Sequence, residues 1–230
     1  MHLSERMKMV AGLVAPCRTL ADVGCDHGYL SIWLLRHAVC GKAIAMDLRE
    51  GPLRHAEENR RFFHMEERME LRRSDGLERL SPQEADAILL AGMGGKLVRD
   101  ILERGAACVG AASQLVLQPQ SELPEVRKYL HRNGFRIAAE AMCLEDGKYY
   151  TAMRAEPGTE PPYTEEEYLA GKCLIDVQHP VAAAYIKMLT EKRRRVMREL
   201  ASADPEKVGE RRQSAQEELR CAQRALERFL

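Results

Sequence analysis

The most informative segment of the chain is Thr19-Leu20-Ala21-Asp22-Val23-Gly24-Cys25-Asp26-His27-Gly28-Tyr29-Leu30. An apolar run ends at an acidic residue, Gly24 and Gly28 then bracket Asp26, and an amphipathic segment begins at Tyr29. This order predicts a buried strand, a tight glycine turn and the N-terminus of a helix. Because glycine has no Cβ, a ligand can lie against the backbone of such a turn. The free N–H groups at the start of the helix favour a polar or anionic group there.

The turn differs at one position from the fingerprint of dinucleotide-binding proteins. That fingerprint, G-x-G-x-x-G, has small residues where the pyrophosphate approaches the backbone. Here Asp26 stands in place of the second glycine. A carboxylate repels a pyrophosphate but attracts a cation, such as the sulfonium group of S-adenosylmethionine (SAM). The turn therefore favours SAM and methyl transfer over NAD, provided that the other strand ends agree with it.

The composition limits the other classes of function. The 230 residues are enough for one core domain and an appendage. The 35 basic and 35 acidic side chains cancel, so any RNA would have to be bound by local clusters of charge. The seven cysteines include no C-x-x-C pair, which indicates reduced thiols and no metal site. We find no signal sequence and no run of membrane-spanning length, and therefore expect a cytoplasmic protein without membrane association or an obligate protein partner.

Strands and helices alternate through the first two thirds of the chain, which predicts a mainly parallel sheet covered by helices on both faces. The predicted strands of this part are Thr19–Val23, Lys42–Met46, Met69–Arg72, Ala85–Ala91 and Gln114–Leu117. Two further strands, Phe135–Ala139 and Tyr149–Arg154, flank a hairpin connection with no helix between them, which predicts an antiparallel strand at one edge. We expect residues 1–158 to form this α/β, Rossmann-like domain.

A second domain is expected over residues 159–230. Pro157, Gly158, Pro161 and Pro162 mark a linker, and the apolar residues beyond it change to a spacing of four and three. Two apolar seams on either side of the turn signal Asp204-Pro205 predict an antiparallel helical hairpin that resembles a coiled coil. The seam of the first helix is interrupted by a charged residue.

Three successive predicted strands end in acidic residues, and the carboxyl ends of parallel strands meet at one edge of a sheet. Asp26 belongs to the first strand end, Asp47 to the second and Asp75 to the third. Asp47 can accept both ribose hydroxyls of SAM because a carboxylate has two acceptor oxygens. Asp75 can accept from the adenine amino group, and Asp26 falls near the sulfonium end. Acidic loop residues are common on protein surfaces, but three in register favour a SAM site.

With these residues in place, the chain resembles the bacterial tRNA (adenine-N1)-methyltransferases that modify adenine 22. The resemblance spans essentially the whole chain. It rests on 21–30, on Asp47 with Gly51-Pro52-Leu53, on Ser74-Asp75-Gly76-Leu77, on Ala91-Gly92-Met93-Gly94-Gly95, on Leu117-Gln118-Pro119 and on Glu145-Asp146-Gly147-Lys148-Tyr149-Tyr150. Ser31 stands where the family pattern has proline, which we expect to affect the start of the helix and not the chemistry.

The resemblance implies a class I methyltransferase fold, SAM as the methyl donor, S-adenosylhomocysteine as the product, tRNA as the substrate and no metal. The implied cofactor-binding residues are Asp22, Gly24, Asp26, His27, Gly28, Tyr29, Asp47, Leu48, Asp75, Gly76, Gly92, Met93 and Gly94. His27 contacts the cofactor or the base, or is merely structural. Tyr29 and Met93 either stack on the target base or pack in the core.

The loop after the fourth strand, Ala91-Gly92-Met93-Gly94-Gly95, has no side chain that could accept an amino proton. Adenine N1 already carries a lone pair, so methylation there requires alignment and accommodation of the positive charge that moves to the base. We predict Asp26 as the catalytic residue in this sense. The alternative is that Asp26 only binds SAM.

The densest cluster of positive charge lies in the predicted hairpin. The predicted RNA-binding residues are Lys192, Arg193, Arg194, Arg195, Arg198, Arg211 and Arg212. Phosphate contacts of this kind give affinity and orientation rather than sequence selectivity. The alternative is a solvated helix surface whose cations pair with nearby glutamates. For the whole chain, the alternatives are a methyltransferase for another RNA or a small molecule, and a SAM-binding or RNA-binding protein without turnover.

Overall fold

The computed structural model describes residues 1–202 and 205–229, and the side chains of 205–208 are left out of the description. Asp204, part of the predicted turn of the hairpin, lies outside the described residues. The chain divides into two compact units, Met1–Glu160 and Pro161–Leu230. Among the described helices, none has the length and apolar character needed to span a membrane.

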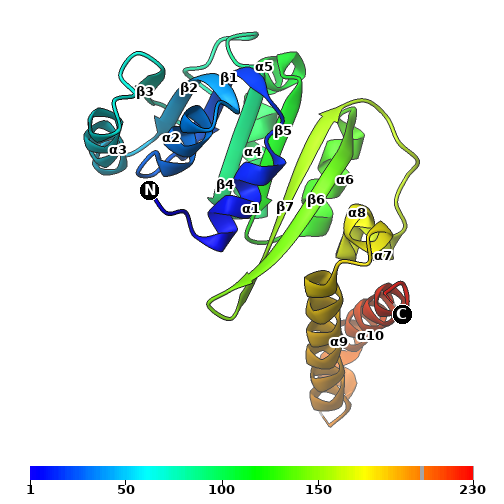
Figure 1. The fold of residues 1–230 in the computed structure, drawn as a ribbon. Helices are drawn as coiled ribbons and strands as arrows, with labels where there is room; N and C mark the ends of the chain where they lie inside the picture. The colour runs from blue at the N-terminus through cyan, green and yellow to red at the C-terminus, as the bar shows by residue number, and fades with distance from the viewer. Residues whose placement is uncertain (203–204, 230) are drawn as a thin grey trace. The chain divides into compact units, whose positions relative to one another are not determined.

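The first unit contains a seven-stranded sheet with the strand order β3-β2-β1-β4-β5-β7-β6 (Figure 1). The five strands β1 to β5 are parallel to one another, which confirms the predicted α/β, Rossmann-like fold. The strands are β1 (Cys17–Val23), β2 (Cys40–Asp47), β3 (Met69–Arg73), β4 (Ala87–Met93), β5 (Gln114–Pro119), β6 (Phe135–Glu145) and β7 (Lys148–Pro157).

The prediction of an antiparallel strand was correct, but the predicted position of that strand at the edge of the sheet was wrong. The antiparallel strand is β7, which pairs with both β5 and β6, so β6 occupies the edge. Strand β6 therefore does not pair with β5, the strand that precedes it in sequence. The hairpin that follows β6 brings β7 back between β5 and β6. The hairpin itself was predicted correctly. Glu145 pairs with Lys148, and the two residues between them, Asp146 and Gly147, have the positive φ values of +49° and +72° that a tight turn requires.

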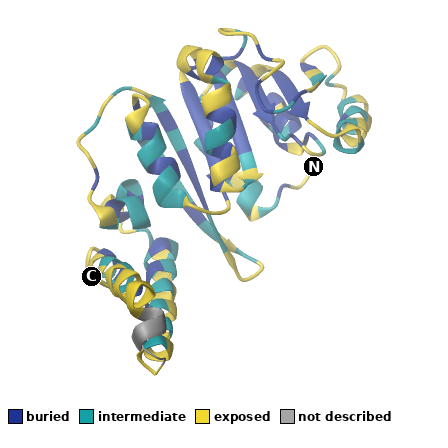
Figure 2. Cartoon of the chain, turned by 180° about the vertical axis from the view of Figure 1, so that it is seen from behind, coloured by how far each residue is buried: buried dark blue, intermediate teal, exposed yellow. Residues whose placement is uncertain are grey.

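Helices cover both faces of the sheet (Figure 1). They are α1 (Glu5–Leu13), α2 (Tyr29–Arg36), α3 (Glu50–Phe62), α4 (Gly95–Arg104), α5 (Ala106–Ala111) and α6 (Leu123–Arg132). The side chain of Ser4 accepts a hydrogen bond from the Met7 N–H and so caps the N-terminus of α1. The central strands are buried along most of their length (Figure 2), and Leu89, Leu90 and Val116 are fully buried. Both faces of β4 and β5 therefore exclude water, which explains their continuous apolar sequence.

The second unit consists of α7 (Glu165–Ala170), α8 (Lys172–Asp176), α9 (Pro180–Ala201) and α10 (Pro205–Glu227). The hydroxyl of Thr190 on α9 donates to the Ala222 carbonyl at 3.3 Å, and the Arg193 guanidinium donates to the Glu218 carbonyl at 2.7 Å. The residue that comes later on α9 thus contacts the residue that comes earlier on α10, so the two helices run antiparallel. The short helices α7 and α8 were not predicted. Helix α7 packs against α10, where Arg224 forms an ion pair with Glu166.

Candidate functional site

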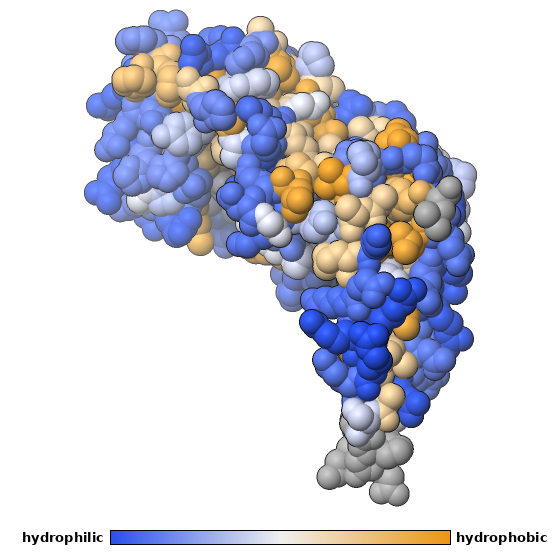
Figure 3. All heavy atoms as spheres, turned by 60° about the horizontal axis from the view of Figure 1, so that its bottom comes forward, coloured by the Kyte–Doolittle hydropathy of each residue, from blue (hydrophilic) through white to orange (hydrophobic). Residues whose placement is uncertain are grey.

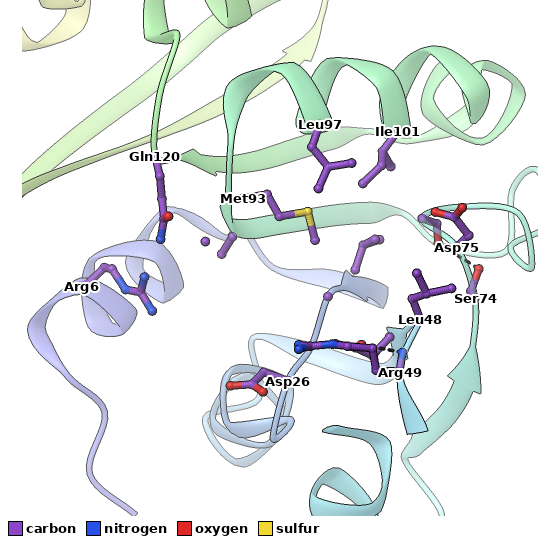
Figure 4. Close-up of a pocket in the computed structure, with 16 residues that line it drawn as sticks. Arg6, Asp26, Leu48, Arg49, Ser74, Asp75, Met93, Leu97, Ile101 and Gln120 are labelled. Carbon is purple, nitrogen blue, oxygen red and sulfur yellow. Dashed lines mark hydrogen bonds and ion pairs between the residues drawn. The ribbon is translucent and has the colours of Figure 1, made fainter. Parts of the chain in front are cut away.

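A cavity of about 520 Å³ lies at the carboxyl ends of the parallel strands (Figure 4). Asp26, Asp47 and Asp75 all line it, although they come from three different strand ends. The topology produces this convergence because β1, β2 and β3 are adjacent and parallel. Parallel α/β sheets bind ligands at this edge. The cavity therefore combines three carboxylates with the glycine turn.

The glycine turn is fixed by hydrogen bonds to the neighbouring strand. The backbone N–H groups of Gly24 and Cys25 both donate to the Met46 carbonyl, at 2.8 and 2.9 Å. Gly24 has a φ of +74°, and a Cβ built on it would lie 2.2 Å from the Cε atom of Met93. A side chain at Gly24 would strain the backbone and collide with Met93. Met93 thus packs against the turn and also lines the cavity.

Gly28 allows the first two helices that follow the turn to approach each other. Its φ is +71°, and a built Cβ would lie 2.7 Å from the Met69 Cε atom and 3.3 Å from the Ala56 Cβ atom. Gly28 also caps α2 and is buried. Its role in the structure is close packing, and it does not line the larger cavity.

Asp47 and Asp75 present their carboxylates differently. The Asp47 side chain is only 7% exposed, and its Oδ1 atom accepts the Arg49 N–H at 2.9 Å. Asp75 is half exposed and forms an ion pair with Arg104 through both oxygens, at 3.1 and 3.2 Å. The hydrogen bonds from Arg104 hold the pKa of Asp75 below its usual value. Each oxygen of Asp75 keeps further acceptor capacity, because a carboxylate has about four lone-pair positions.

Apolar side chains close the part of the cavity next to these two carboxylates. Leu48 follows Asp47 directly, and Leu97 and Ile101 come from α4 (Figure 4). Gly76 has a φ of +57°, and a built Cβ would lie 3.0 Å from Ile101, so the loop after β3 packs closely on α4. The polar rim and the apolar walls together suit a flat heteroaromatic ring with hydrogen-bonding edges.

A second cavity of about 140 Å³ shares Arg6, Gly24, Asp26 and Ala91 with the first. Its polar lining includes two buried groups. Asp22 is 4% exposed, and its Oδ2 atom accepts the Ser31 hydroxyl at 2.6 Å. Burial raises the pKa of Asp22 to about 6, and the hydrogen bond from Ser31 opposes this rise. Ser31 therefore contacts a carboxylate of the site, although the sequence predicted an effect on the helix start alone.

Gln118 is the other buried polar group of the smaller cavity. Its side chain is fully buried, and its Oε1 atom has no hydrogen-bond partner among the residues that the structure describes. A buried carbonyl oxygen without a donor is costly, by about 1–3 kcal/mol. A ligand with a donor group would remove this cost.

The exposed residues of the turn lie between the two cavities. The Asp26 side chain is 65% exposed, lines both cavities and has its carboxylate 3.7 Å from the His27 imidazole. The ring of His27 stacks on Tyr29 and also meets His55 of α3, with ring centroids 5.9 and 4.9 Å apart. His27 and Tyr29 line the smaller cavity, and the Asn59 amide holds the His27 carbonyl.

The end of β4 carries a bulge at Gly92. Ala91 pairs with Gln118 and Met93 pairs with Pro119, so Gly92 is the extra residue, and its φ is +81°. Gly92 lines the larger cavity with bare backbone. Gly94 lies in an extended conformation and forms the cap of α4.

Sequence reasoning missed three polar residues of the two cavities. Arg6 belongs to α1 and lines both cavities. Gln118 and Gln120 follow the apolar core of β5, and Gln120 lines the larger cavity. A polar side chain at the carboxyl end of a buried strand was the available signal for both glutamines.

The cations of the helical hairpin face two ways. Arg193 points across to α10, where it donates to the Glu218 carbonyl, and Arg211 pairs with the Glu218 carboxylate at 3.2 Å. The other cations lie on the outside of the hairpin, where hydrophilic side chains gather (Figure 3). Among these, Lys192, Arg195 and Arg198 line a shallow hollow with Met188 and Glu191. Arg194 pairs with Glu191, Arg195 with Glu199, and Arg212 is exposed.

Comparison with known proteins agrees with this geometry. A family model described as a methyltransferase domain matches residues 3–153. The tRNA (adenine(22)-N(1))-methyltransferase of Bacillus subtilis (strain 168) is 35% identical over 159 residues, which is 69% of this chain and 66% of that protein. The chain thus spans just under two thirds of the length of that relative.

Solved structures match over almost the full chain. The structure of the Bacillus subtilis m1A22 tRNA methyltransferase superimposes with a TM-score of 0.90 and 26% identity, covering 98% of this chain and 99% of that one. A Streptococcus pneumoniae protein assigned as a tRNA (m1A22) methyltransferase, solved in complex with S-adenosyl-L-methionine, superimposes with a TM-score of 0.87 and 29% identity. It covers 98% of this chain and 100% of that one.

Proposed function

Because the chain belongs to the methyltransferase-domain family, among the bacterial tRNA (adenine(22)-N1)-methyltransferases, we propose that it methylates N1 of adenine 22 in tRNA. The methyl donor is SAM and the by-product is S-adenosylhomocysteine. The observation that carries this proposal is the cavity at the sheet edge, where carboxylates from three successive strand ends surround a glycine turn. A cationic donor fits that charge distribution better than a pyrophosphate does.

The lining of the larger cavity fits the adenosine part of SAM. Asp47 would accept the ribose hydroxyls, with its carboxylate held in place by the Arg49 N–H. Asp75 would accept from the adenine amino group while it keeps its ion pair with Arg104. Leu48 and Ile101 supply apolar contacts for the ring.

The smaller cavity fits the amino-acid end of SAM, which carries an ammonium and a carboxylate. Asp22 and the unpartnered Oε1 atom of Gln118 are acceptors for the ammonium. The Arg6 guanidinium, placed over the Tyr150 ring at 5.2 Å, is a donor for the carboxylate. The two cavities share Gly24, so one extended molecule would cross the bare backbone of the turn.

When bound, SAM supplies a methyl group on a positively charged sulfur. The task of the protein is then to align adenine N1 with that methyl group and to stabilise the charge that passes to the base. Asp26 lines both cavities and is not buried, so its carboxylate is placed to face either the sulfur or the base. Because N1 has its own lone pair, no general base is required. N1 lies on the pairing edge of adenine, so the base has to be unpaired or flipped out.

The helical hairpin supplies the proposed phosphate contacts. Lys192, Arg195 and Arg198 share one exposed face of α9, where several cations can follow an RNA backbone. Arg193 holds α9 to α10 through Glu218, and Arg211 pairs with the same Glu218 within α10, so both contribute indirectly. We place the protein in the cytoplasm, where tRNA is modified in bacteria.

The direct test uses methyl-labelled SAM, the full-length protein and an unmodified tRNA transcript with adenine at position 22. Label in the RNA and a reverse-transcription stop at that adenine are the expected results. A transcript with guanine at the same position is the control and should stay unlabelled at that site. Label at another nucleotide would indicate a different RNA target, and SAM binding without transfer would indicate a binding protein.

A further inference from the structure

Gln120 lies at the edge of the larger cavity and is held there by its backbone. It follows Pro119, the last residue of β5, and its N–H donates to the Met93 carbonyl at 2.8 Å. Its side chain is exposed, lines the cavity and forms no hydrogen bond with any other described residue. The amide is therefore free to bind a ligand, with a rigid backbone behind it.

The space in front of this amide lies over Gly92. A Cβ built on Gly92 would lie 3.8 Å from the Arg6 Nη1 atom and 3.9 Å from the Gln120 Nε2 atom. Figure 4 shows Arg6 and Gln120 reaching toward the end of β4 from opposite sides. Since Gly92 has a φ of +81°, the bulge favours glycine there, and Gly92 itself puts no side chain between the two groups.

A glutamine amide has one acceptor and two donor hydrogens, and these match one edge of adenine. Its oxygen can accept from the adenine N6 amino group while its NH₂ group donates to N7. This pairing leaves N1 free, since N1 lies on the other side of the amino group. Guanine presents two acceptors, O6 and N7, on the same edge, so the amide oxygen would face a carbonyl oxygen.

We propose that Gln120 is the residue that selects adenine at the reacting position, by pairing with N6 and N7 of the base. This inference rests on the proposed function, because it concerns the base whose N1 is methylated. Gln120 acts here as a specificity-determining residue. It stands beside Gly92, at the other end of the larger cavity from Leu48 and Asp75, which we assign to the adenosine of SAM (Figure 4). Binding of S-adenosylhomocysteine should therefore be the same in Gln120 variants and in the wild type.

The test combines a change in the base, which removes the N7 acceptor, with changes in the side chain at position 120. tRNA with adenine or with 7-deazaadenine at position 22 is methylated under single-turnover conditions by the wild type, by Gln120→Ala and by Gln120→Glu. 7-Deazaadenine lacks the N7 acceptor but keeps N6 and N1. For the wild type we expect the 7-deaza base to react roughly 10-fold more slowly, the loss of one good hydrogen bond.

Gln120→Ala should react more slowly with adenine, and its rates with the two bases should be nearly equal. In Gln120→Glu a carboxylate oxygen faces the N7 lone pair, so the 7-deaza base should react faster than adenine. A change in the intrinsic reactivity of N1 affects all enzymes alike and cancels in this comparison. Gln83→Gly is the matched control: Gln83 is exposed, has a φ of +67° that glycine adopts without strain, and should behave as the wild type.

A ratio of the 7-deaza rate to the adenine rate that is the same in Gln120→Ala as in the wild type would overturn the proposal. Failure of the wild type to methylate the adenine transcript would instead reject the proposed function. Unchanged binding of S-adenosylhomocysteine by calorimetry shows that a slow variant is folded.

Discussion

Replacing Ser31 with alanine removes the hydrogen bond that supports the charge of Asp22. The Ser31 hydroxyl donates to Asp22 at 2.6 Å, and both side chains are buried. Burial already raises the pKa of Asp22 to about 6. A hydrogen bond to a charged group contributes about 1–2 kcal/mol more than one to a neutral group, so its loss should raise this pKa by about one unit, to about 7.

The consequence for SAM binding follows from the ionised fraction of Asp22. If the ammonium of SAM binds only to the carboxylate form, the variant should bind roughly 5-fold more weakly than the wild type at pH 6, about 2-fold more weakly at pH 7, and equally at pH 8. The pH dependence that Asp22 gives to the stability of the fold has the opposite sign to that of a carboxylate whose pKa is lowered by folding. Because the folded-state pKa of Asp22 lies above the unfolded value, this group stabilises the fold below the unfolded pKa, and the contribution is lost as the pH rises through 6.

Calorimetric titration with S-adenosylhomocysteine between pH 5.5 and 8.5 measures this shift. Ser113→Ala serves as the matched control, since the exposed Ser113 hydroxyl donates to a backbone carbonyl and to no carboxylate. A pH profile of Ser31→Ala that coincides with the wild-type profile would show that Asp22 does not bind the ammonium in its ionised form. Asp22→Asn should bind weakly at every pH, and a normal profile there would refute the reasoning independently.

Asp26→Ala should lower the rate of methyl transfer by much more than it lowers the affinity for S-adenosylhomocysteine, because the proposed role of the exposed carboxylate is to stabilise the charge that reaches the base; equal losses in the two measurements would reduce Asp26 to a cofactor ligand. Replacing Lys192, Arg195 and Arg198 together by alanine should weaken tRNA binding and lower the slope of log K against log salt by roughly 2–3, with SAM binding unchanged. Arg193→Ala should instead lower the melting temperature with little change in that slope, since this side chain bonds to α10; identical slopes for the triple variant and the wild type would exclude the exposed face of α9 as the phosphate-binding surface.

Local patterns predicted most of the strands and helices of the first unit because each depends on neighbours in sequence. The glycine turn and the apolar run of β4 are of this kind. The position of β7 between β5 and β6 is different. Whether β6 or β7 pairs with β5 depends on contacts between segments that are distant in sequence, and no short segment contains that information.

The candidate site divides in the same way. Asp22, Asp26, Asp47 and Asp75 could be predicted because parallel strands bring their ends to one edge. Arg6 could not be predicted, since its approach to Gly92 depends on how α1 packs against the sheet, and α1 is far from Gly92 in sequence. The missed short helices α7 and α8, of six and five residues, lack the repeats that a periodic pattern needs.

The basic segment of α9 shows how a helical period separates charges that are adjacent in sequence. Ile186 and Thr190 are buried against α10, and residue 193 is the next position on that face. A cation at this position has to find an acceptor across the interface, which Arg193 does at the Glu218 carbonyl. The interruption of the apolar seam was therefore the sign of an interhelical contact. The neighbouring cations lie on the exposed face for the same geometric reason, so the proposed phosphate-binding surface follows from the helical period and not from the number of basic residues.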